Sequence, residues 1–238
     1  MNNKILITIA ARGGSKGVKD KNIRPLAGVP LIAHTIRQAK EWGRGARIIC
    51  STDSEAIAAA ARQFGAEVPF TRPAELAGDE SGKIDVLRHA LKTMEELDGE
   101  QYDILVDLDV TSPIRTAADI ENAYRMFLDK KPDSVVSVTR CRRNPYFNML
   151  EPQESGFVGL VKFPRQPVRR RQDAPVVYDM NASIYVYDRA FLLNETTKTA
   201  ISPRSLVSLM DEKSAFDIDS EEDFHFIEYM VKNNIVTL

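Results

Sequence analysis

Short β-branched runs alternate with longer amphipathic segments along the whole chain, and no other feature of the sequence restricts the fold as much. The first run is ILITIA at residues 5–10. Strands that alternate with helical patterns are typical of βαβ units, which build a mostly parallel sheet flanked by helices. We therefore expect strands at residues 4–10, 46–51, 102–109, 133–139, 182–188 and 214–218, and helices at 30–42, 54–65, 82–97, 116–129 and 220–233.

Residues suited to helix ends stand at several of these boundaries. Thr116 with Asp119 and Ser220 with Asp223 fit the capping-box pattern, and Gly65 can take the left-handed conformation that ends a helix. A chain of 238 residues can bury one substantial core. We therefore expect a single α/β domain that covers residues 1–238.

Residues 140–178 interrupt the alternation. This segment contains five prolines and seven arginines, a composition that disfavours a central strand or a long helix. An irregular segment of this length inside a compact domain usually serves a binding surface or a partner. We expect an inserted arm that makes a dimer contact.

Composition limits the partners and the compartment. The 32 basic and 34 acidic residues give a net charge of -2, so the chain has no global reason to bind nucleic acid. No apolar run approaches the length that spans a bilayer, and we expect no membrane segment. Cys50 and Cys141 do not suggest a disulfide framework, which favours reduced thiols in the cytoplasm.

A loop rich in glycine and lysine follows the first expected strand. It reads AARGGSKGVKDKNIR at residues 10–24. Gly13, Gly14 and Gly17 would let the backbone approach an oxyanion at the carboxyl edge of the sheet. The basic residues of the loop suit a polyphosphate, and they are Arg12, Lys16, Lys19, Lys21 and Arg24. The spacing fits neither a P-loop nor a dinucleotide fingerprint, so spacing alone leaves a solvated basic turn open.

Two pairs of aspartates stand where strands are expected to end. Asp107 and Asp109 would project to one face of a strand, and Asp217 and Asp219 repeat the arrangement. Clustered carboxylates repel each other unless a cation or a donor lies between them, and an oxygen site beside a polyphosphate favours Mg²⁺. A second role is open for Asp219, because a carboxylate at the start of the following helix suits the helix dipole.

Six stretches, in chain order, resemble one family. They are ARGGSKGVKDKNIRPLAGVPLIAHTI, STDSEAIAAAARQFGAEV, RPAELA with the adjacent Asp79, TSPIR, NASIYVY and FDIDSEEDF. This order resembles the CMP-nonulosonate synthetases, the acylneuraminate cytidylyltransferase family that activates sialic acid and its relatives. LVDLDVTSPIR, RRNPYFN and YDMNASIYVYD are most similar to the CMP-legionaminate branch. The resemblance implies a Rossmann-like nucleotidyltransferase fold with a dimerisation arm inserted at residues 140–178.

The resemblance also implies roles for individual residues. For CTP it indicates Arg12, Gly13, Ser15, Lys16, Lys21, Asn22, Arg72, Asp79, Ser81 and Lys83, and it makes Arg12, Lys21 and Asp217 catalytic. For the sugar acid it indicates Asp109, Ser112, Arg171 and Tyr185, and for Mg²⁺ it indicates Asp217 and Asp219. Sialate-type relatives have a glutamine in place of Asp109, which predicts a different sugar pocket here. Their arm crosses a dimer, which implies a homodimer with arm exchange in which Arg171 serves the neighbouring site.

The expected reaction is a nucleotidyl transfer. The anomeric 2-hydroxyl of a nine-carbon 2-keto sugar acid would attack the α-phosphorus of CTP, release pyrophosphate and form a CMP-sugar. The proton acceptor stays open between a water on the metal, Asp109 and no dedicated base. The nearer alternative is a CMP-N-acetylneuraminate or eight-carbon sugar-acid cytidylyltransferase, and the more distant one is a non-catalytic nucleotide-binding module. Three scattered histidines and the lack of a G-x-S-x-G elbow give no support to a histidine metal site or to acyl transfer.

Overall fold

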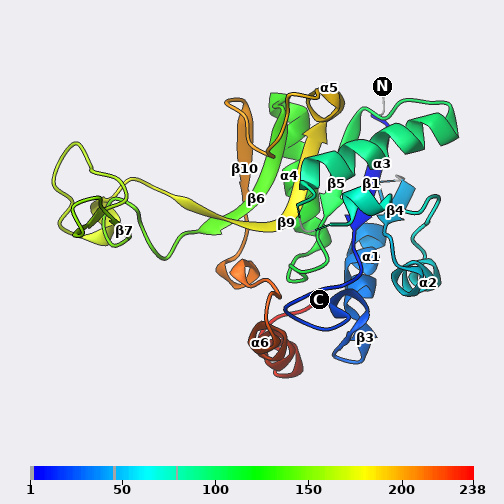
Figure 1. Ribbon diagram of the computed structural model, residues 1–238, viewed down its shortest axis with the longest axis horizontal. Coiled ribbons are helices and arrows are strands. Elements are labelled where there is room, and N and C mark those ends of the chain that lie inside the picture. Colours follow the sequence, from blue (N-terminus) through cyan, green and yellow to red (C-terminus); the bar gives the residue numbers. More distant parts are fainter. Residues whose placement is uncertain (1–2, 45–46, 79) are drawn as a thin grey trace.

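A six-stranded sheet forms the centre of the molecule (Figure 1). The computed structural model describes residues 3–44, 47–78 and 80–238. The strands of the sheet are β1 (Ile5–Ala10), β4 (Arg47–Ser51), β5 (Ile104–Leu108), β6 (Ser134–Arg140), β9 (Tyr178–Asp188) and β10 (Ser205–Leu209), in the spatial order β10-β6-β9-β5-β1-β4. All neighbours pair in parallel except β9, which runs antiparallel to both β5 and β6. The prediction of a mostly parallel α/β sheet is confirmed.

In the part of the chain that the structure describes, six α-helices lie between and after these strands. They are α1 (Leu31–Trp42), α2 (Glu55–Phe64), α3 (Lys83–Asp98), α4 (Ala117–Lys130), α5 (Arg189–Leu193) and α6 (Glu221–Lys232). Short 3₁₀ turns are η1 (Lys21–Ile23), η2 (Ala74–Leu76), η3 (Arg171–Asp173) and η4 (Glu212–Ala215), and the hairpin of β2 (Pro25–Leu26) with β3 (Val29–Pro30) leads into α1. Both predicted capping boxes are present, and Gly65 ends α2 with a φ of 94°.

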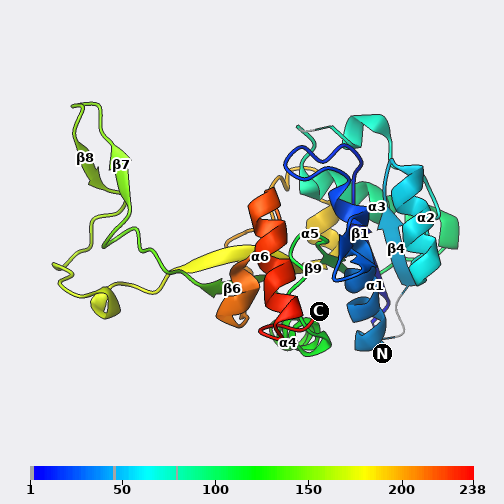
Figure 2. The ribbon, with the colours of Figure 1, turned by 90° about the horizontal axis from the view of Figure 1, so that it is seen from below.

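Helices cover both faces of the sheet because side chains alternate along its buried central strands. Ile7 of β1 packs into a cluster with Trp42 of α1 and Phe127 of α4. Leu6, its neighbour in sequence, points the other way and packs with Leu87 of α3. The sheet therefore lies between α1 and α4 on one face and α3 and α5 on the other (Figure 2).

The strand expected at residues 214–218 is wrong, and the sixth strand of the sheet is β10, which the sequence pattern missed. The Asp211 side chain accepts a hydrogen bond from the backbone N–H of Lys213 at 2.8 Å, and the carbonyl of Asp211 accepts one from the N–H of Ser214. These local bonds wind residues 212–215 into η4 instead of an extended strand.

Residues 141–177 leave the body between β6 and β9 and form the arm (Figures 1 and 2). The arm contains the small hairpin of β7 (Leu150–Pro152) with β8 (Val158–Leu160) and the turn η3. It projects far from the sheet, as its proline-rich composition predicts for chain that cannot join a central strand. Among the described residues, no helix combines the length and apolarity needed to cross a membrane.

Candidate functional site

A polar cleft opens beside the carboxyl ends of β1 and β5. Its volume is about 470 Å³. It is lined by Ala10, Arg12, Ser15, Lys16, Gly17, Lys21, Asn22, Arg72, Leu76, Gly78, Ser81, Lys83, Val86, Asp109, Thr111 and Asp219. Ligands of open parallel sheets usually bind at this edge. Eight of the ten residues predicted for CTP therefore meet in one cleft; Gly13 does not line it, and Asp79 lies outside the described residues.

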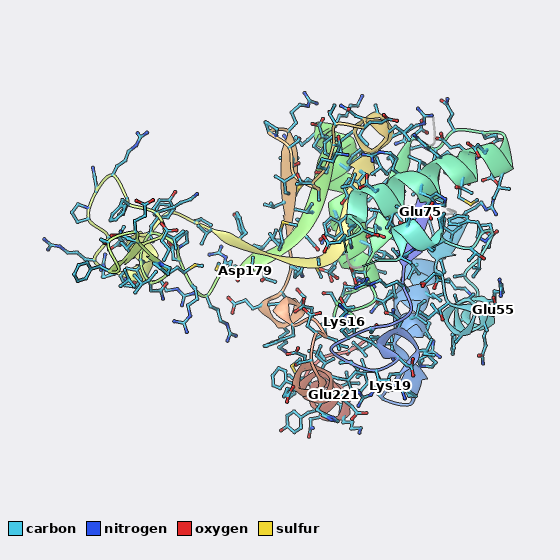
Figure 3. The ribbon with its side chains drawn as sticks, in the orientation of Figure 1. Lys16, Lys19, Glu55, Glu75, Asp179 and Glu221 are labelled. Carbon is cyan, nitrogen blue, oxygen red and sulfur yellow. The ribbon has the colours of Figure 1, made fainter. Side chains whose placement is uncertain are left out.

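The glycine and lysine loop forms one wall of the cleft. The Nη1 of Arg12 donates to the carbonyl of Ala77 at 3.2 Å, which joins the loop to the opposite wall. Buried Asn22 donates from Nδ2 to the carbonyl of Arg12 at 2.9 Å and fixes the turn. In Figure 3, Lys16 and Lys19 lie toward the same end of the body as the start of α6. The loop therefore presents several cations from a backbone that is held in place.

Position 17 needs a glycine because of a contact within the protein. A Cβ atom at this position would stand 1.9 Å from the backbone oxygen of Asp219. Gly13 uses its N–H to donate to the Oδ1 of Asp53 at 2.8 Å, so that N–H is engaged within the protein. Of the three glycines expected to approach an oxyanion, Gly17 lines the cleft, and it also lets the loop touch the segment that carries the second aspartate pair.

Arg72 and Ser81 stand on the wall opposite the loop. Arg72 is 5% exposed, and its guanidinium donates to the carbonyl and to the hydroxyl of Ser51. Burial lowers the pKa of Arg72 from its usual value, although the nearby charge of Asp53 opposes this. Ser81 donates from Oγ to the carbonyl of Glu75 at 2.9 Å. Both side chains are thus oriented before any ligand binds.

In the first aspartate pair, Asp109 lines the cleft and Asp107 does not, and a cation lies between the two. The Nζ of Lys83 stands 3.0 Å from the Oδ2 of Asp107 and 2.7 Å from the Oδ2 of Asp109. Asp107 is fully buried and also accepts from the hydroxyl of Thr8 at 3.0 Å. The other carboxylate oxygen of Asp109 accepts from the N–H of Thr111 at 2.9 Å and from its hydroxyl at 3.0 Å. Lys83 therefore occupies the place between the carboxylates where a metal was considered.

Charges within this cluster shift the pKa values of Asp109 and Lys83. Burial alone would raise the pKa of Asp109, but Lys83 and Thr111 stabilise the anion and lower the pKa to about 2. Burial alone would lower the pKa of Lys83, but Asp107 and Asp109 raise it well above its usual value. At neutral pH Asp109 is therefore a carboxylate and Lys83 an ammonium.

Two of the residues predicted to bind the sugar, Tyr185 and Ser112, differ in their relation to this cluster. Tyr185 is 5% exposed, and its ring centroid lies 4.4 Å from the Nζ of Lys83, a cation–π contact. Ser112 is fully buried and does not line the cleft; its carbonyl accepts from Nη1 of Arg115 at 3.1 Å and from the hydroxyl of Ser183 at 3.2 Å. A direct sugar contact by Ser112 stays a prediction that this burial does not favour.

The second aspartate pair lies on the short segment between η4 and α6. Asp219 lines the cleft, and the Nζ of Lys21 stands 3.4 Å from its Oδ1 and 2.5 Å from the carbonyl of Ile218. Partial desolvation raises the pKa of Asp217, and the charge of Asp219 raises it further. The pair was expected at the end of a strand, and the structure places it on irregular chain instead.

Two carboxylates that repel each other beside a cationic cleft suit a divalent cation. Mg²⁺ usually takes one or two protein carboxylates and completes its ligands with water and phosphate oxygens. No cluster of three or more histidine, cysteine or acidic residues with metal geometry occurs in residues 3–44, 47–78 and 80–238. The donor set of Asp217 and Asp219 therefore fits a metal that also binds a phosphate ligand, and it does not fit a closed structural site.

Arg171 stands apart from this cleft. It lies in η3 of the arm, is exposed, and donates from Nη2 to the carbonyl of Cys141 at 3.1 Å. The structure therefore does not bring Arg171 together with Asp109 and Tyr185 in one chain. The sequence pattern also missed cleft residues, among them Leu76, Gly78 and Thr111, although RPAELA and TSPIR include or adjoin them.

Comparisons with known proteins agree with this geometry. The family model described as cytidylyltransferase matches residues 6–224. The chain is 44% identical to the post-translational flagellin modification protein B of Campylobacter coli, over 97% of this chain and 96% of that protein. It is 42% identical to the CMP-N,N'-diacetyllegionaminic acid synthase of Campylobacter jejuni, over 96% of this chain and 95% of that protein.

A solved structure is similar in fold. The CMP:2-keto-3-deoxy-manno-octonic acid synthetase complexed with CTP superposes with a TM-score of 0.71 at 18% identity, over 97% of this chain and 99% of that chain. At this identity the likeness establishes only a shared fold. Membership of the cytidylyltransferase family rests on the family model and the relatives above.

Proposed function

Because this chain belongs to the cytidylyltransferase family, we propose that it transfers CMP from CTP to the anomeric 2-hydroxyl of a nine-carbon 2-keto sugar acid of the legionaminate type. The observation that carries this proposal is the 42% identity to the CMP-N,N'-diacetyllegionaminic acid synthase over almost the whole chain. The cleft adds the chemistry, since it gathers cations for a triphosphate beside a floor that can accept hydrogen bonds from a sugar.

The cationic wall is suited to the triphosphate. Arg12, Lys16 and Lys21 would neutralise phosphate oxygens, and a fixed cation lowers the barrier most where charge develops in the transition state. Lys21 is positioned for this by its bond to the carbonyl of Ile218. Asp217 and Asp219 would hold Mg²⁺, which when bound neutralises phosphate oxygens and orients the triphosphate. The 2-oxygen forms a bond to the α-phosphorus, pyrophosphate leaves, and the hydroxyl proton passes to solvent.

Asp109 is suited to orient the sugar and poorly suited to accept its proton. Both of its carboxylate oxygens already accept hydrogen bonds, from Lys83 and from Thr111. The pKa of about 2 further disfavours proton transfer to Asp109 at neutral pH. We propose that its remaining lone pairs accept from a hydroxyl or amide N–H of the sugar, a task that a glutamine would perform with different geometry.

A second copy of this chain is the proposed partner of the arm. Phe157 is 76% exposed, Phe163 is 73% exposed and Leu150 is 61% exposed, and apolar side chains gathered on one projection suit burial against another surface. Arg171, on the same arm, would then reach the cleft of the second copy and pair with the sugar carboxylate. The free thiols Cys50 and Cys141 suit the cytoplasm as the place of this reaction.

Pyrophosphate release tests the proposed function directly. CTP and Mg²⁺ are supplied with legionaminate-type, pseudaminate-type, N-acetylneuraminate and eight-carbon sugar acids in parallel. We expect turnover with the legionaminate type, and its loss in Asp217→Ala but not in Glu222→Ala, a matched change at an exposed acid of α6. Turnover with the eight-carbon acid alone would replace the proposed substrate. CTP binding without release of pyrophosphate in the presence of any of the sugar acids would favour a non-catalytic nucleotide-binding module.

A further inference from the structure

The ladder between β6 and β9 shifts register where the arm leaves the body. The shift falls between Val136 and Val138 of β6, so that residues 181–184 of β9 lie opposite Ser137. We call this irregularity, with four residues opposite one, the bulge; such an interruption of the ladder bends a strand and redirects its side chains. Within it, Ala182 has a φ of 53°, a left-handed conformation that costs a residue with a Cβ about 1 kcal/mol or more. Side-chain contacts around the bulge must therefore hold it.

The amide of Asn181 supplies those contacts. Asn181 is 5% exposed, and its Oδ1 accepts from the hydroxyl of Ser137 at 2.6 Å. The same hydroxyl accepts from the N–H of Ile184 at 2.8 Å, which closes the bulge. On its other side, the Nδ2 of Asn181 donates to the carbonyl of Ser214 at 3.0 Å and to its hydroxyl at 3.1 Å. One buried side chain thus joins the base of the arm to η4.

The turn η4 leads directly into the second aspartate pair. Ser214 precedes Asp217 by three residues. Ile218 follows at once, is fully buried, and donates its N–H to the carbonyl of Thr111 at 2.8 Å. Asp217 is therefore an exposed residue between two anchors, one at Ser214 and one at Ile218. Because only three residues separate these anchors, the place of the Asp217 carboxylate depends on both.

We propose that Asn181 is a positioning residue that ties the base of the arm to the Asp217 carboxylate and thereby sets the affinity of the metal that this carboxylate would hold. The identity of the metal rests on the proposed function; the hydrogen bonds of Asn181 do not. If the arm contacts a second copy in a dimer, Asn181 would connect the position of the arm to the position of the metal ligands. Groups that hold metal ligands in place typically change metal affinity by about 10–100-fold when they are removed.

The test compares two buried asparagines in the full chain. Asn181→Ala should raise the dissociation constant of Mn²⁺, measured by electron paramagnetic resonance in the presence of CTP, about tenfold. It should also speed hydrogen exchange of the backbone at residues 212–219. Asn144→Ala is the control: its Nδ2 donates to the carbonyl of Pro175 at 2.9 Å, so its contacts stay within the arm. This variant should leave Mn²⁺ affinity and the exchange of residues 212–219 unchanged.

Unchanged Mn²⁺ affinity in folded Asn181→Ala would overturn the inference, even if exchange became faster. Should that variant fail to fold, Ser214→Ala removes one acceptor of the Asn181 amide and should shift both quantities in the same direction by less; no shift would again overturn it. A parent protein that releases no pyrophosphate counts against the proposed function only, because neither measurement requires turnover.

Discussion

The two aspartate pairs have the same spacing in the sequence and opposite surroundings in the fold. Asp107 is fully buried, and Lys83 stands within 3.0 Å of both its carboxylate and that of Asp109. Asp217 and Asp219 are exposed on irregular chain, with Lys21 3.4 Å from one oxygen of Asp219. The first pair is neutralised inside the fold, whereas the second is exposed, and Asp219, though not Asp217, lines the cleft.

The place of each pair relative to the sheet explains the difference. Strand β5 pairs with β1 on one side and β9 on the other, so Asp107 near its end is cut off from water. Removing a carboxylate from water costs several kcal/mol unless a cation pairs with it, and a central strand therefore requires a partner such as Lys83. Asp217 and Asp219 belong to no strand, and both are exposed. Two aspartates one residue apart thus indicate a metal site only where the fold leaves them exposed.

The largest effect that would separate the pairs is on stability. Asp107→Ala should lower the free energy of unfolding by about 3–5 kcal/mol, because Lys83 and Thr8 both lose a buried partner. Asp217→Ala should change it by less than about 0.5 kcal/mol, as is usual for an exposed side chain. Urea unfolding followed by circular dichroism measures both. Equal losses would mean that the two pairs do not differ in this way.

Metal dependence should separate them in the opposite direction. Asp217→Asn should raise the Mg²⁺ concentration for half-maximal turnover by about 10–100-fold, because an amide oxygen replaces a charged ligand. Asp109→Asn should leave that concentration unchanged and alter the KM for the sugar instead, since Lys83 already serves this carboxylate. The measurement is pyrophosphate release against Mg²⁺ at saturating CTP. A Mg²⁺ shift in Asp109→Asn would place this residue among the metal ligands.

The contact between the glycine loop and the second aspartate pair predicts a smaller effect, a loss of turnover at low Mg²⁺. A methyl group added by Gly17→Ala would overlap the backbone oxygen of Asp219, and relief of such overlap typically costs about 1–3 kcal/mol. Turnover should fall by about tenfold at low Mg²⁺ and recover in part as Mg²⁺ is raised. Gly14→Ala is the control, because an added Cβ there meets no atom within 4 Å and only the φ of 66° is strained. Equal Mg²⁺ dependence in both variants would argue against the contact.

The dependence of stability on acid pH should distinguish the two aspartate pairs least, because many other carboxylates titrate in the same pH range. The pKa of Asp109 is about 2 in the folded protein and near its ordinary value after unfolding. Its contribution to stability is therefore complete above about pH 4 and is lost as the pH falls toward 2. Asp109→Asn should flatten the decline of the unfolding free energy between pH 4 and pH 2. An unchanged slope would show that the carboxylate is not held by Lys83 and Thr111.

Much of the fold followed from local pattern. The alternation of strands and helices, both capping boxes and the place of the arm follow from hydrophobic period, hydrogen-bonding side chains and proline content, which act over a few residues. The exception is instructive. FDID has a strand-like alternation, yet residues 216–219 join no strand. The N–H of Ile218 donates to the carbonyl of Thr111, and β10 pairs beside β6 instead.

The candidate site was predicted as a set of residues but not as an arrangement. The loop at residues 10–24 depends on residue types that lie close together in the chain, and three of its five predicted cations line the cleft, Arg12, Lys16 and Lys21. Lys19 and Arg24 do not line it, and Arg24 pairs with Glu221 instead. By contrast, the ion pairs of Lys83 join residues 24 and 26 positions apart, and the bond of Asn181 to Ser214 spans 33.

Residue types and their periodicity predicted the α/β class and the cation-rich loop, because each depends on neighbours in the chain; the metal ligands stay predictions. Only the tertiary structure decided that Lys83 neutralises Asp107 and Asp109, that Ser112 is buried, and that Gly17 touches Asp219. The physical reason is that the energy of a charge depends on its access to water and on its distance from other charges. Both quantities are set by segments that meet in space after long separations in sequence.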